Sequence, residues 1–281
     1  MDGLVIGLDL NDDYTQICCY DKEKSWTIPT VICRRKEEEV WLSGEEAYAA
    51  TLLGEGVIVD KLLKMAAKDG TSTIGGIRYG GAQLMVQFLI QVLTLAKEEY
   101  GTEAISQLVF SVPKIEARLL KCLTSCGDYL GVEEKDIHVV SHTESFMYYV
   151  LSQKREVWNN QVGMFDLSAE GLCYYEMKVQ RGLRQTTVVA ERERLEEGFS
   201  LDILNTAAGG KMADRILCSC GNRLLQKKLF SSVFLTGKGF ENRDWAAGFM
   251  KLICNRRRVY AEAELFAKGA VLRAEDLLRE K

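Results

Sequence analysis

The chain has 281 residues, of which 47% are hydrophobic and 27% are charged. A chain of this size and composition can bury an extensive apolar core, so we expect one or two globular domains rather than a disordered protein. The 36 basic and 40 acidic side chains give a net charge of −4, which disfavours a nucleic-acid-binding protein. No uncharged apolar run approaches the ~20 residues that cross a bilayer, so we predict neither a membrane span nor a secretion signal.

Nine cysteines occur without a regular spacing. In a chain of this length, such a pattern indicates reduced thiols and therefore a cytoplasmic protein. Two close pairs, Cys122 with Cys126 and Cys218 with Cys220, are weak candidates for a zinc site, because structural zinc takes four ligands and the chain has only two histidines. We interpret these cysteines as small buried apolar residues. A serine or cysteine hydrolase is also disfavoured, since no nucleophile-elbow motif is present.

The chain is predicted to begin with a β-hairpin. Residues 4–10 and 15–20 are short apolar strands on either side of the polar turn Asn11-Asp12-Asp13. Two further strands are predicted near residues 29–33 and 40–42. The first fifty residues are therefore expected to be rich in short strands.

Helices and strands are predicted to alternate after this region. Apolar residues at helical spacing predict an amphipathic helix over residues 82–100. The elements expected after it are a strand at 107–112, a helix at 115–129, a strand at 137–140 and a helix at 143–153. This β/α alternation is typical of a parallel sheet.

The opening pattern returns in the second half of the chain. Residues 5–10 (VIGLDL) correspond to residues 162–167 (VGMFDL), and each copy places an aspartate, Asp9 or Asp166, near the end of an apolar strand before a tight turn. A second strand follows each turn, at 172–179 in the later copy. Such a duplication indicates two similar domains.

The remaining elements complete a second domain. They are a strand at 183–190, a helix at 199–207, a strand at 232–236 that runs into Gly237-Lys238-Gly239, and helices at 243–253 and 262–279. We therefore predict a first domain at 1–160 and a second at 161–262. Residues 263–281 are a candidate helix for packing back onto the first domain.

Seven segments in order match one family pattern. They are IGLDLNDDYTQICCY, IPTVICRRKEEEVWLSGEEA, VFSVP at 109–113, HVVSHTESFMYYV at 138–150, MFDLSAEGLCYYEM at 164–177, VFLTGKGF at 233–240 and AKGAVLRAEDLL at 267–278. In this order they resemble the nucleotide-binding domain of heat-shock-70-type chaperones, which belongs to the superfamily of actin and hexokinase. No single segment is specific, and the resemblance depends on their order.

The resemblance implies an α/β protein with the two-domain actin-like (ribonuclease H-like) fold, with mixed sheets, flanking helices and an interdomain cleft. It implies ATP or ADP with Mg²⁺ as cofactor, Asp9 and Asp166 as catalytic residues that hold the metal through bound water, and Glu144 as a further catalytic candidate. The implied nucleotide-binding residues are Asn11, Asp12, Asp13, Ser168, Ala169, Glu170, Gly171, Gly237, Lys238, Gly239 and Phe240. Glycines in such loops let backbone N–H groups approach phosphate oxygens.

The phosphate loops depart from the family pattern. Ser168, Ala169 and Glu170 occupy the positions of three glycines, Gly171 that of a threonine, and Asn11-Asp12-Asp13 replaces Gly-Thr-Thr. A carboxylate ~4 Å from a phosphate charge costs about 4 kcal/mol at an effective dielectric near 20. Direct alignment puts His142 where the family has its catalytic glutamate, and Glu144 takes that place only after a slip of two residues.

Three functions are compatible with these observations. The first is a pseudo-ATPase or weak nucleotide binder that acts as a regulatory or scaffolding protein with an unidentified protein partner and needs no cofactor. The second is an active ATPase or nucleotide switch, in which Asp9, Asp12, Asp166 and Glu170 hold divalent cations. The third is a filament-forming actin-like protein, which rests on fold analogy alone. The sequence leaves open whether the chain is an enzyme; an active protein of this kind would hydrolyse ATP.

Overall fold

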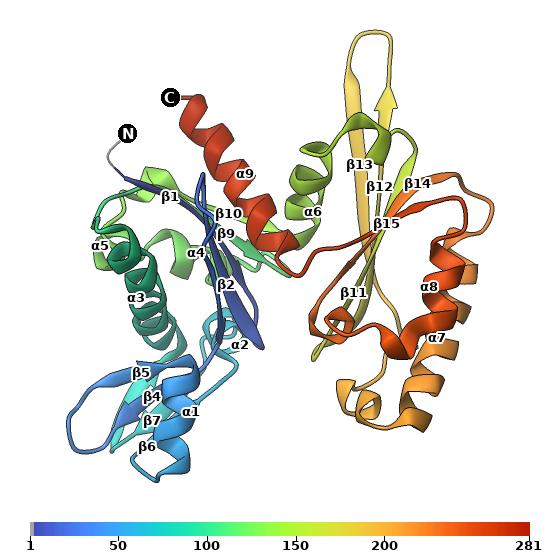
Figure 1. Cartoon of the computed structure of the whole chain (residues 1–281). Helices are drawn as coiled ribbons and strands as arrows, with labels where there is room; N and C mark the ends of the chain where they lie inside the picture. The colour runs from blue at the N-terminus through green and yellow to red at the C-terminus, as the bar shows by residue number, and fades with distance from the viewer. Residues whose placement is uncertain (1–2) are drawn as a thin grey trace. The chain divides into compact units, whose positions relative to one another are not determined.

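A computed structural model describes residues 3–281 and divides the chain into two compact units (Figure 1). The first unit contains the chain up to Ser145 together with Phe266–Lys281, and the second contains Phe146–Leu265. The division falls inside helix α6 (His142–Leu151), before the boundary after residue 160 that was predicted from the sequence. None of the helices in residues 3–281 combines the length and the apolar composition needed to cross a membrane.

The first unit is built on a five-stranded mixed sheet. Its strand order is β3-β2-β1-β9-β10, in which β1 pairs antiparallel with β2 and parallel with β9. The strands are β1 (Leu4–Leu10), β2 (Tyr14–Cys19), β3 (Ser25–Pro29), β9 (Ile105–Val112) and β10 (Ile137–Ser141). The predicted hairpin and the parallel strands are therefore parts of one sheet.

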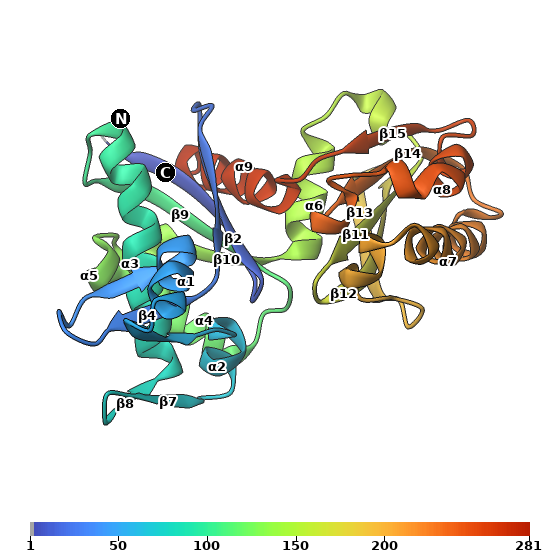
Figure 2. The ribbon, with the colours of Figure 1, turned by 60° about the horizontal axis from the view of Figure 1, so that its bottom comes forward.

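The central strand β1 is buried on both faces, which explains its continuous apolar sequence. Side chains alternate between the faces of a strand, so Ile6 and Leu8 join the larger core. Figures 1 and 2 show helix α3 (Gly81–Tyr100) over this face and helix α9 (Leu265–Arg279) along the other. On the α9 side, Val5 packs with Ala270 and Ala274.

Smaller elements complete the first unit. A three-stranded sheet, in the order β5-β4-β6, is covered by helix α1, and a β7–β8 hairpin precedes α3. These elements are β4 (Ile32–Arg35), β5 (Trp41–Ser43), α1 (Gly44–Leu52), β6 (Gly56–Val59), α2 (Leu62–Ala67), β7 (Thr71–Ile74) and β8 (Ile77–Gly80). After β9 come α4 (Ala117–Thr124), α5 (Gly127–Leu130) and the 3₁₀ turn η1 (Glu134–Asp136).

The second unit repeats the strand order of the first. Its sheet, β13-β12-β11-β14-β15, has a central strand β11 that pairs antiparallel with β12 and parallel with β14. The strands are β11 (Gln161–Ser168), β12 (Gly171–Arg181), β13 (Thr186–Arg194), β14 (Phe230–Thr236) and β15 (Arg258–Ala261). The helices are α7 (Ala207–Leu225) and α8 (Ala247–Ile253), with 3₁₀ turns at Arg155–Val157, Leu201–Asn205, Lys238–Phe240 and Asp244–Ala246.

These observations confirm the predicted fold class: an α/β protein with two mixed five-stranded sheets flanked by helices, consistent with two ribonuclease H-like halves. The duplication inferred from the two aspartate motifs is present as an identical strand order. The chain also forms α1, β6, α2, the β7–β8 hairpin and β15, none of which was predicted from the sequence.

Three predicted elements were wrong in detail. The helix expected at 199–207 is a 3₁₀ turn over Leu201–Asn205, and the long helix α7 that follows it was not predicted. The hydroxyl of Thr206 caps α7 by accepting from Gly209 N at 3.0 Å. Glycines in the first turn of α7 lowered its apparent helix propensity. The helix expected at 115–129 is broken into α4 and α5, and the strand expected at 29–33 is divided between β3 and β4.

Candidate functional site

A row of polar side chains crosses the first sheet beside the end of β1. Asp9 lies opposite Gln16 on β2 and Ser111 on β9, and cross-strand partners share one face of a sheet. All three residues are buried. The Ser111 hydroxyl is 2.6 Å from the Ser145 hydroxyl on α6, so this row continues into the helix above the sheet.

Asp9 is bound by a histidine at the start of α6. Its Oδ1 is 2.6 Å from Nε2 of His142, and the Asp9 residue is fully buried. The imidazole stacks on the ring of Phe266 in the first turn of α9, with ring centroids 3.8 Å apart and planes 6° apart. Oδ2 of Asp9 has no hydrogen-bond partner within residues 3–281. The imidazole therefore occupies one oxygen of the carboxylate, and the other lies in a closed environment.

Glu144 belongs to the N-terminus of α6. One of its carboxylate oxygens accepts from Ser141 N at 3.3 Å and from the Ser141 hydroxyl at 3.2 Å, while the same hydroxyl accepts from Glu144 N at 3.2 Å. This reciprocal arrangement is a capping box, which satisfies backbone donors that a helix leaves free at its start. The structure thus gives this glutamate a local structural role.

The turn between β1 and β2 is held by its own polar side chains. Oδ1 of Asn11 accepts from the backbone N–H groups of Asp13 at 3.0 Å and Tyr14 at 2.9 Å. Such an Asx turn explains why asparagine occupies this position. The Asn11 side chain points back into its own turn.

Asp12 binds the start of α2. Its carboxylate accepts from Leu63 N at 2.8 Å and Lys64 N at 3.3 Å, two donors at the N-terminus of that helix. Burial raises the pKa of Asp12, and these two hydrogen bonds oppose that shift. Asp12, which the resemblance includes among the nucleotide-binding residues, therefore links the first turn to α2.

The corresponding turn in the second unit is a two-residue hairpin. Ser168 pairs with Gly171, whose φ of +122° favours glycine, and Ala169 and Glu170 are exposed between them. The Ser168 hydroxyl accepts from Glu170 N at 3.3 Å, and Arg194 donates to the Glu170 carbonyl oxygen at 2.9 Å. Side chains are therefore present at the positions where the family pattern has glycines.

Asp166 lies beside Gly237. The aspartate is 9% exposed and lies between Cys173 and Thr236 in the neighbouring strands. Gly237 has a φ of +93°, and a Cβ atom there would lie 2.6 Å from Oδ1 of Asp166 and 2.3 Å from the Leu167 carbonyl oxygen. This glycine is needed for close packing of the turn against β11.

The segment after Gly237 forms a 3₁₀ turn over Lys238–Phe240. Phe240 is 2% exposed and stacks with Trp245 and Phe249 in the core of the second unit. A Cβ atom on Gly239 would lie 2.4 Å from Leu167, so this glycine also serves close packing. Gly237, Gly239 and Phe240 are therefore packed within the second unit, whereas Lys238 is exposed.

Comparison with protein-family profiles assigns the chain to a family. The profile described as "Family of unknown function (DUF5716) C-terminal" matches residues 13–281. The chain belongs to this family. No curated protein matches the sequence.

The predicted site residues of this DUF5716 member fall into two groups. Asp9, Asn11, Asp12, Asp13 and Glu144 lie around the β1–β2 turn and the start of α6, and the others lie around the β11–β12 turn and Gly237 in the second unit. Within residues 3–281, no group of three or more His, Cys, Asp or Glu side chains is arranged to hold a metal ion. His142 covers Asp9, and the Asp12 carboxylate is hydrogen-bonded to the start of α2. The first-unit residues therefore do not fit the arrangement of Mg²⁺ and nucleotide that the resemblance implies.

Two residues of this site were missed: His142, which binds Asp9, and Phe266, which stacks on His142. His142 was recognised only as an aligned position, and Phe266 was not singled out at all. No local pattern connects Asp9, His142 and Phe266, because 133 residues separate Asp9 from His142 and the contact exists only after α6 and α9 pack on the sheet.

Proposed function

We propose that this DUF5716 member is a pseudo-ATPase: a protein of actin-like architecture that does not hydrolyse ATP and acts as a regulatory or scaffolding protein. The observation that carries the proposal is the buried contact between Asp9 and His142 beneath the Phe266 ring. A metal-organising aspartate needs at least one oxygen accessible to water or metal. The His142 imidazole and the surrounding core deny that access in this conformation.

The acids of the two turns support the same proposal. Asp12 is hydrogen-bonded to the start of α2, and Glu170 projects from the tip of the β11–β12 turn. Glycine positions that would let a backbone approach phosphate carry the side chains of Ser168, Ala169 and Glu170. These substitutions weaken phosphate binding through both space and charge.

A metal-dependent nucleotide switch is the second candidate. Oδ2 of Asp9 and Oδ2 of Asp13 are buried and have no hydrogen-bond partner within residues 3–281. An unpaired buried carboxylate oxygen is costly, and a cation that entered there would relieve the cost. Rotation of the His142 side chain would be required first.

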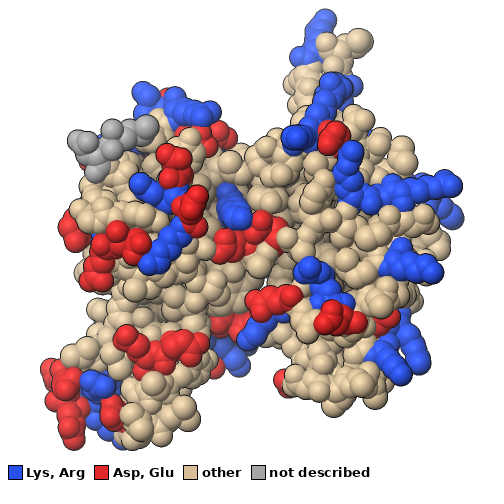
Figure 3. Space-filling view, in the orientation of Figure 1, with Lys and Arg blue, Asp and Glu red and all other residues tan. Residues whose placement is uncertain are grey.

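We place the protein in the cytoplasm, with another protein as its partner. All nine cysteines are free thiols, which a reducing compartment preserves. The net charge of −4 disfavours a nucleic-acid partner, and on the face drawn in Figure 3 acidic side chains are more frequent on the first unit and basic ones on the second. A scaffold of this kind acts through its surface.

Titration calorimetry of ATP and ADP, each with and without Mg²⁺, tests the proposal. We expect no binding at millimolar nucleotide for the wild-type protein. His142→Ala, with its fold checked by circular dichroism, provides the matched comparison, because it uncovers Asp9 without removing the carboxylate. Micromolar, Mg²⁺-dependent binding by the wild type that is lost in Asp9→Asn would contradict the proposal and favour the switch.

A further inference from the structure

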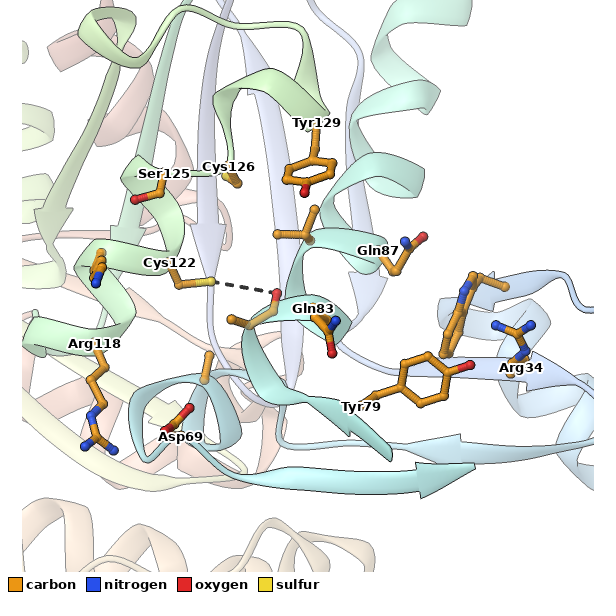
Figure 4. A pocket seen from close by; sticks show the side chains of 15 residues that line it. Arg34, Asp69, Tyr79, Gln83, Gln87, Arg118, Cys122, Ser125, Cys126 and Tyr129 are labelled. Atoms are coloured by element: carbon orange, nitrogen blue, oxygen red, sulfur yellow. Dashed lines mark hydrogen bonds between the residues drawn. The ribbon is translucent and has the colours of Figure 1, made fainter. Parts of the chain in front are cut away.

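A groove with a volume of about 740 Å³ lies in the first unit between helices α3 and α4 (Figure 4). None of its lining residues is among the predicted nucleotide-binding residues. The groove is therefore a second candidate site, and its interpretation does not depend on whether nucleotide binds.

Two helices form the long sides of the groove. The lining residues from α4 and the position after it follow the helical spacing i, i+3, i+4, i+7. The lining residues from α3 lie on one face of that helix. They are Arg118, Lys121, Cys122 and Ser125 on the first side, and Ala82, Gln83, Val86 and Gln87 on the second. Helices set side by side in this way leave a channel that runs along them.

The bottom of the groove is apolar. Ala66, Val86 and Cys126 contribute small or branched side chains, and Ala66 and Cys126 are buried. Burial raises the pKa of Cys122 to about 11 and that of Cys126 to about 12. Both thiols are therefore uncharged at neutral pH and add to the apolar surface.

The rim of the groove is basic and aromatic. The side chains of Arg118 and Lys121 make no ion pair or hydrogen bond with any residue in 3–281. At one end, the Arg34 guanidinium lies 5.2 Å from the ring centroid of Trp41 and 5.8 Å from that of Tyr79. Figure 4 shows Arg34 and Tyr79 close together at this end and Tyr129 above the centre.

The groove differs in charge from the unit that contains it. The first unit has 18 Lys and Arg against 26 Asp and Glu, a net charge of −8. The lining has three cations, Arg34, Arg118 and Lys121, against the single acid Asp69. A local positive region on an acidic unit attracts an acidic ligand and repels a basic one.

The groove is too open to enclose a small molecule. Small-molecule sites bury most of the ligand surface, whereas Ala82, Gln83, Lys121 and Tyr129 in this lining are exposed. A helix laid along α3 and α4 needs contact on one side only. We propose that this groove binds an acidic amphipathic helix of a partner protein, with apolar side chains on Val86 and Cys126 and carboxylates on Arg118 and Lys121.

A displayed library of random peptides of about 16 residues, long enough for four helical turns, tests the proposal. The full chain is the target, and the charge-reversed variant Arg118→Glu/Lys121→Glu is the counter-target. We expect the selected peptides to be enriched in Asp and Glu at helical spacing from Leu, Phe or Trp. Their binding, followed by fluorescence anisotropy, should weaken about tenfold or more in the variant and as salt is raised.

Two further variants make the result specific. Ala82→Trp fills the groove without changing its charge and should also abolish peptide binding. Lys178→Glu/Arg181→Glu reverses two exposed charges on β12 and should leave peptide binding unchanged. Circular dichroism and thermal midpoints verify that each variant is folded. The proposal is overturned if no peptide is selected, if the selected peptides lack an excess of acids, or if they bind the Arg118→Glu/Lys121→Glu variant as tightly as the wild type.

Discussion

Two pairs of buried polar side chains link the sheet of the first unit to α6. Asp9 with His142 and Ser111 with Ser145 connect the sheet to α6, and each pair lies almost wholly out of water. Buried polar groups are retained in folded proteins when a partner satisfies them. The sequence pattern was sufficient to single out Asp9, because an acid inside an apolar strand is unusual. It did not predict the partner, which comes from a distant helix.

Removing the partner of Asp9 should destabilise the protein. We expect His142→Ala to lower the free energy of unfolding by about 3 kcal/mol, since it leaves a buried carboxyl group without its hydrogen bond and removes the stacking on Phe266. His138→Ala is the matched control, because His138 is partly exposed on β10. This substitution should lower the free energy of unfolding by about 0.5 kcal/mol or less. Urea denaturation measures both. Equal effects of the two substitutions would show that the contact contributes little.

The raised pKa of Asp12 predicts a pH-dependent contribution to stability. Its folded-state pKa lies above the ordinary aspartate value of about 3.9, so the folded chain holds the Asp12 proton more tightly than the unfolded chain does. The contribution of Asp12 to stability must then increase as the pH falls through the folded-state pKa toward 3.9. We expect the wild type to gain stability relative to Asp12→Asn between pH 7 and about pH 4. Urea denaturation at both pH values measures the difference in stability between the wild type and Asp12→Asn. A difference that does not change with pH, or changes in the opposite direction, would contradict a raised pKa for Asp12.

At the scale of elements, two glycines allow α9 to lie close to its neighbours. A Cβ atom on Gly7 in β1 would lie 2.3 Å from Val271 N, and one on Gly269 would lie 2.1 Å from the Ser145 carbonyl oxygen. The sequence predicted the long helices α3 and α9 and the central strands well because their apolar periodicity is strong, but it did not predict the long helix α7. The short elements α1, α2, β7 and β8 were missed, since each is too short for a periodic signal. They are stabilised by tertiary contacts: α1 packs on β4, α2 and β8 pack on α3, and β7 pairs with β8.

Enlarging one of these glycines should separate α9 from α6. We expect Gly269→Ala to cost about 3 kcal/mol, because the new methyl group meets backbone that cannot rotate away. At Gly80, which has an extended backbone, the nearest atom to a Cβ would be a side-chain oxygen 3.6 Å away, so Gly80→Ala should cost less than about 1 kcal/mol. Thermal unfolding followed by circular dichroism compares the two variants. A Gly269→Ala protein as stable as Gly80→Ala would exclude close packing at this point.

At the scale of the whole molecule, the chain is two units of the same strand order with different surfaces. The first unit carries a net charge of −8, and the second, with 18 Lys and Arg against 14 Asp and Glu, a net charge of +4. The repeat of an aspartate, a turn and a returning strand was enough to predict the duplicated architecture. The contacts of each aspartate could not be predicted from the sequence. The hydrogen bond from His142 to Asp9 and the close approach of Gly237 to Asp166 arise only on folding.

The most direct test of the pseudo-ATPase proposal is a steady-state assay of phosphate release from ATP at millimolar Mg²⁺. It compares the wild type with Asp9→Ala, prepared identically and shown to be folded. The account predicts no release above background from either protein, because the Asp9 carboxylate is held by His142 and the turn residues carry side chains where phosphate would lie. Metal-dependent turnover by the wild type that disappears in Asp9→Ala would contradict it and identify the chain as an active ATPase.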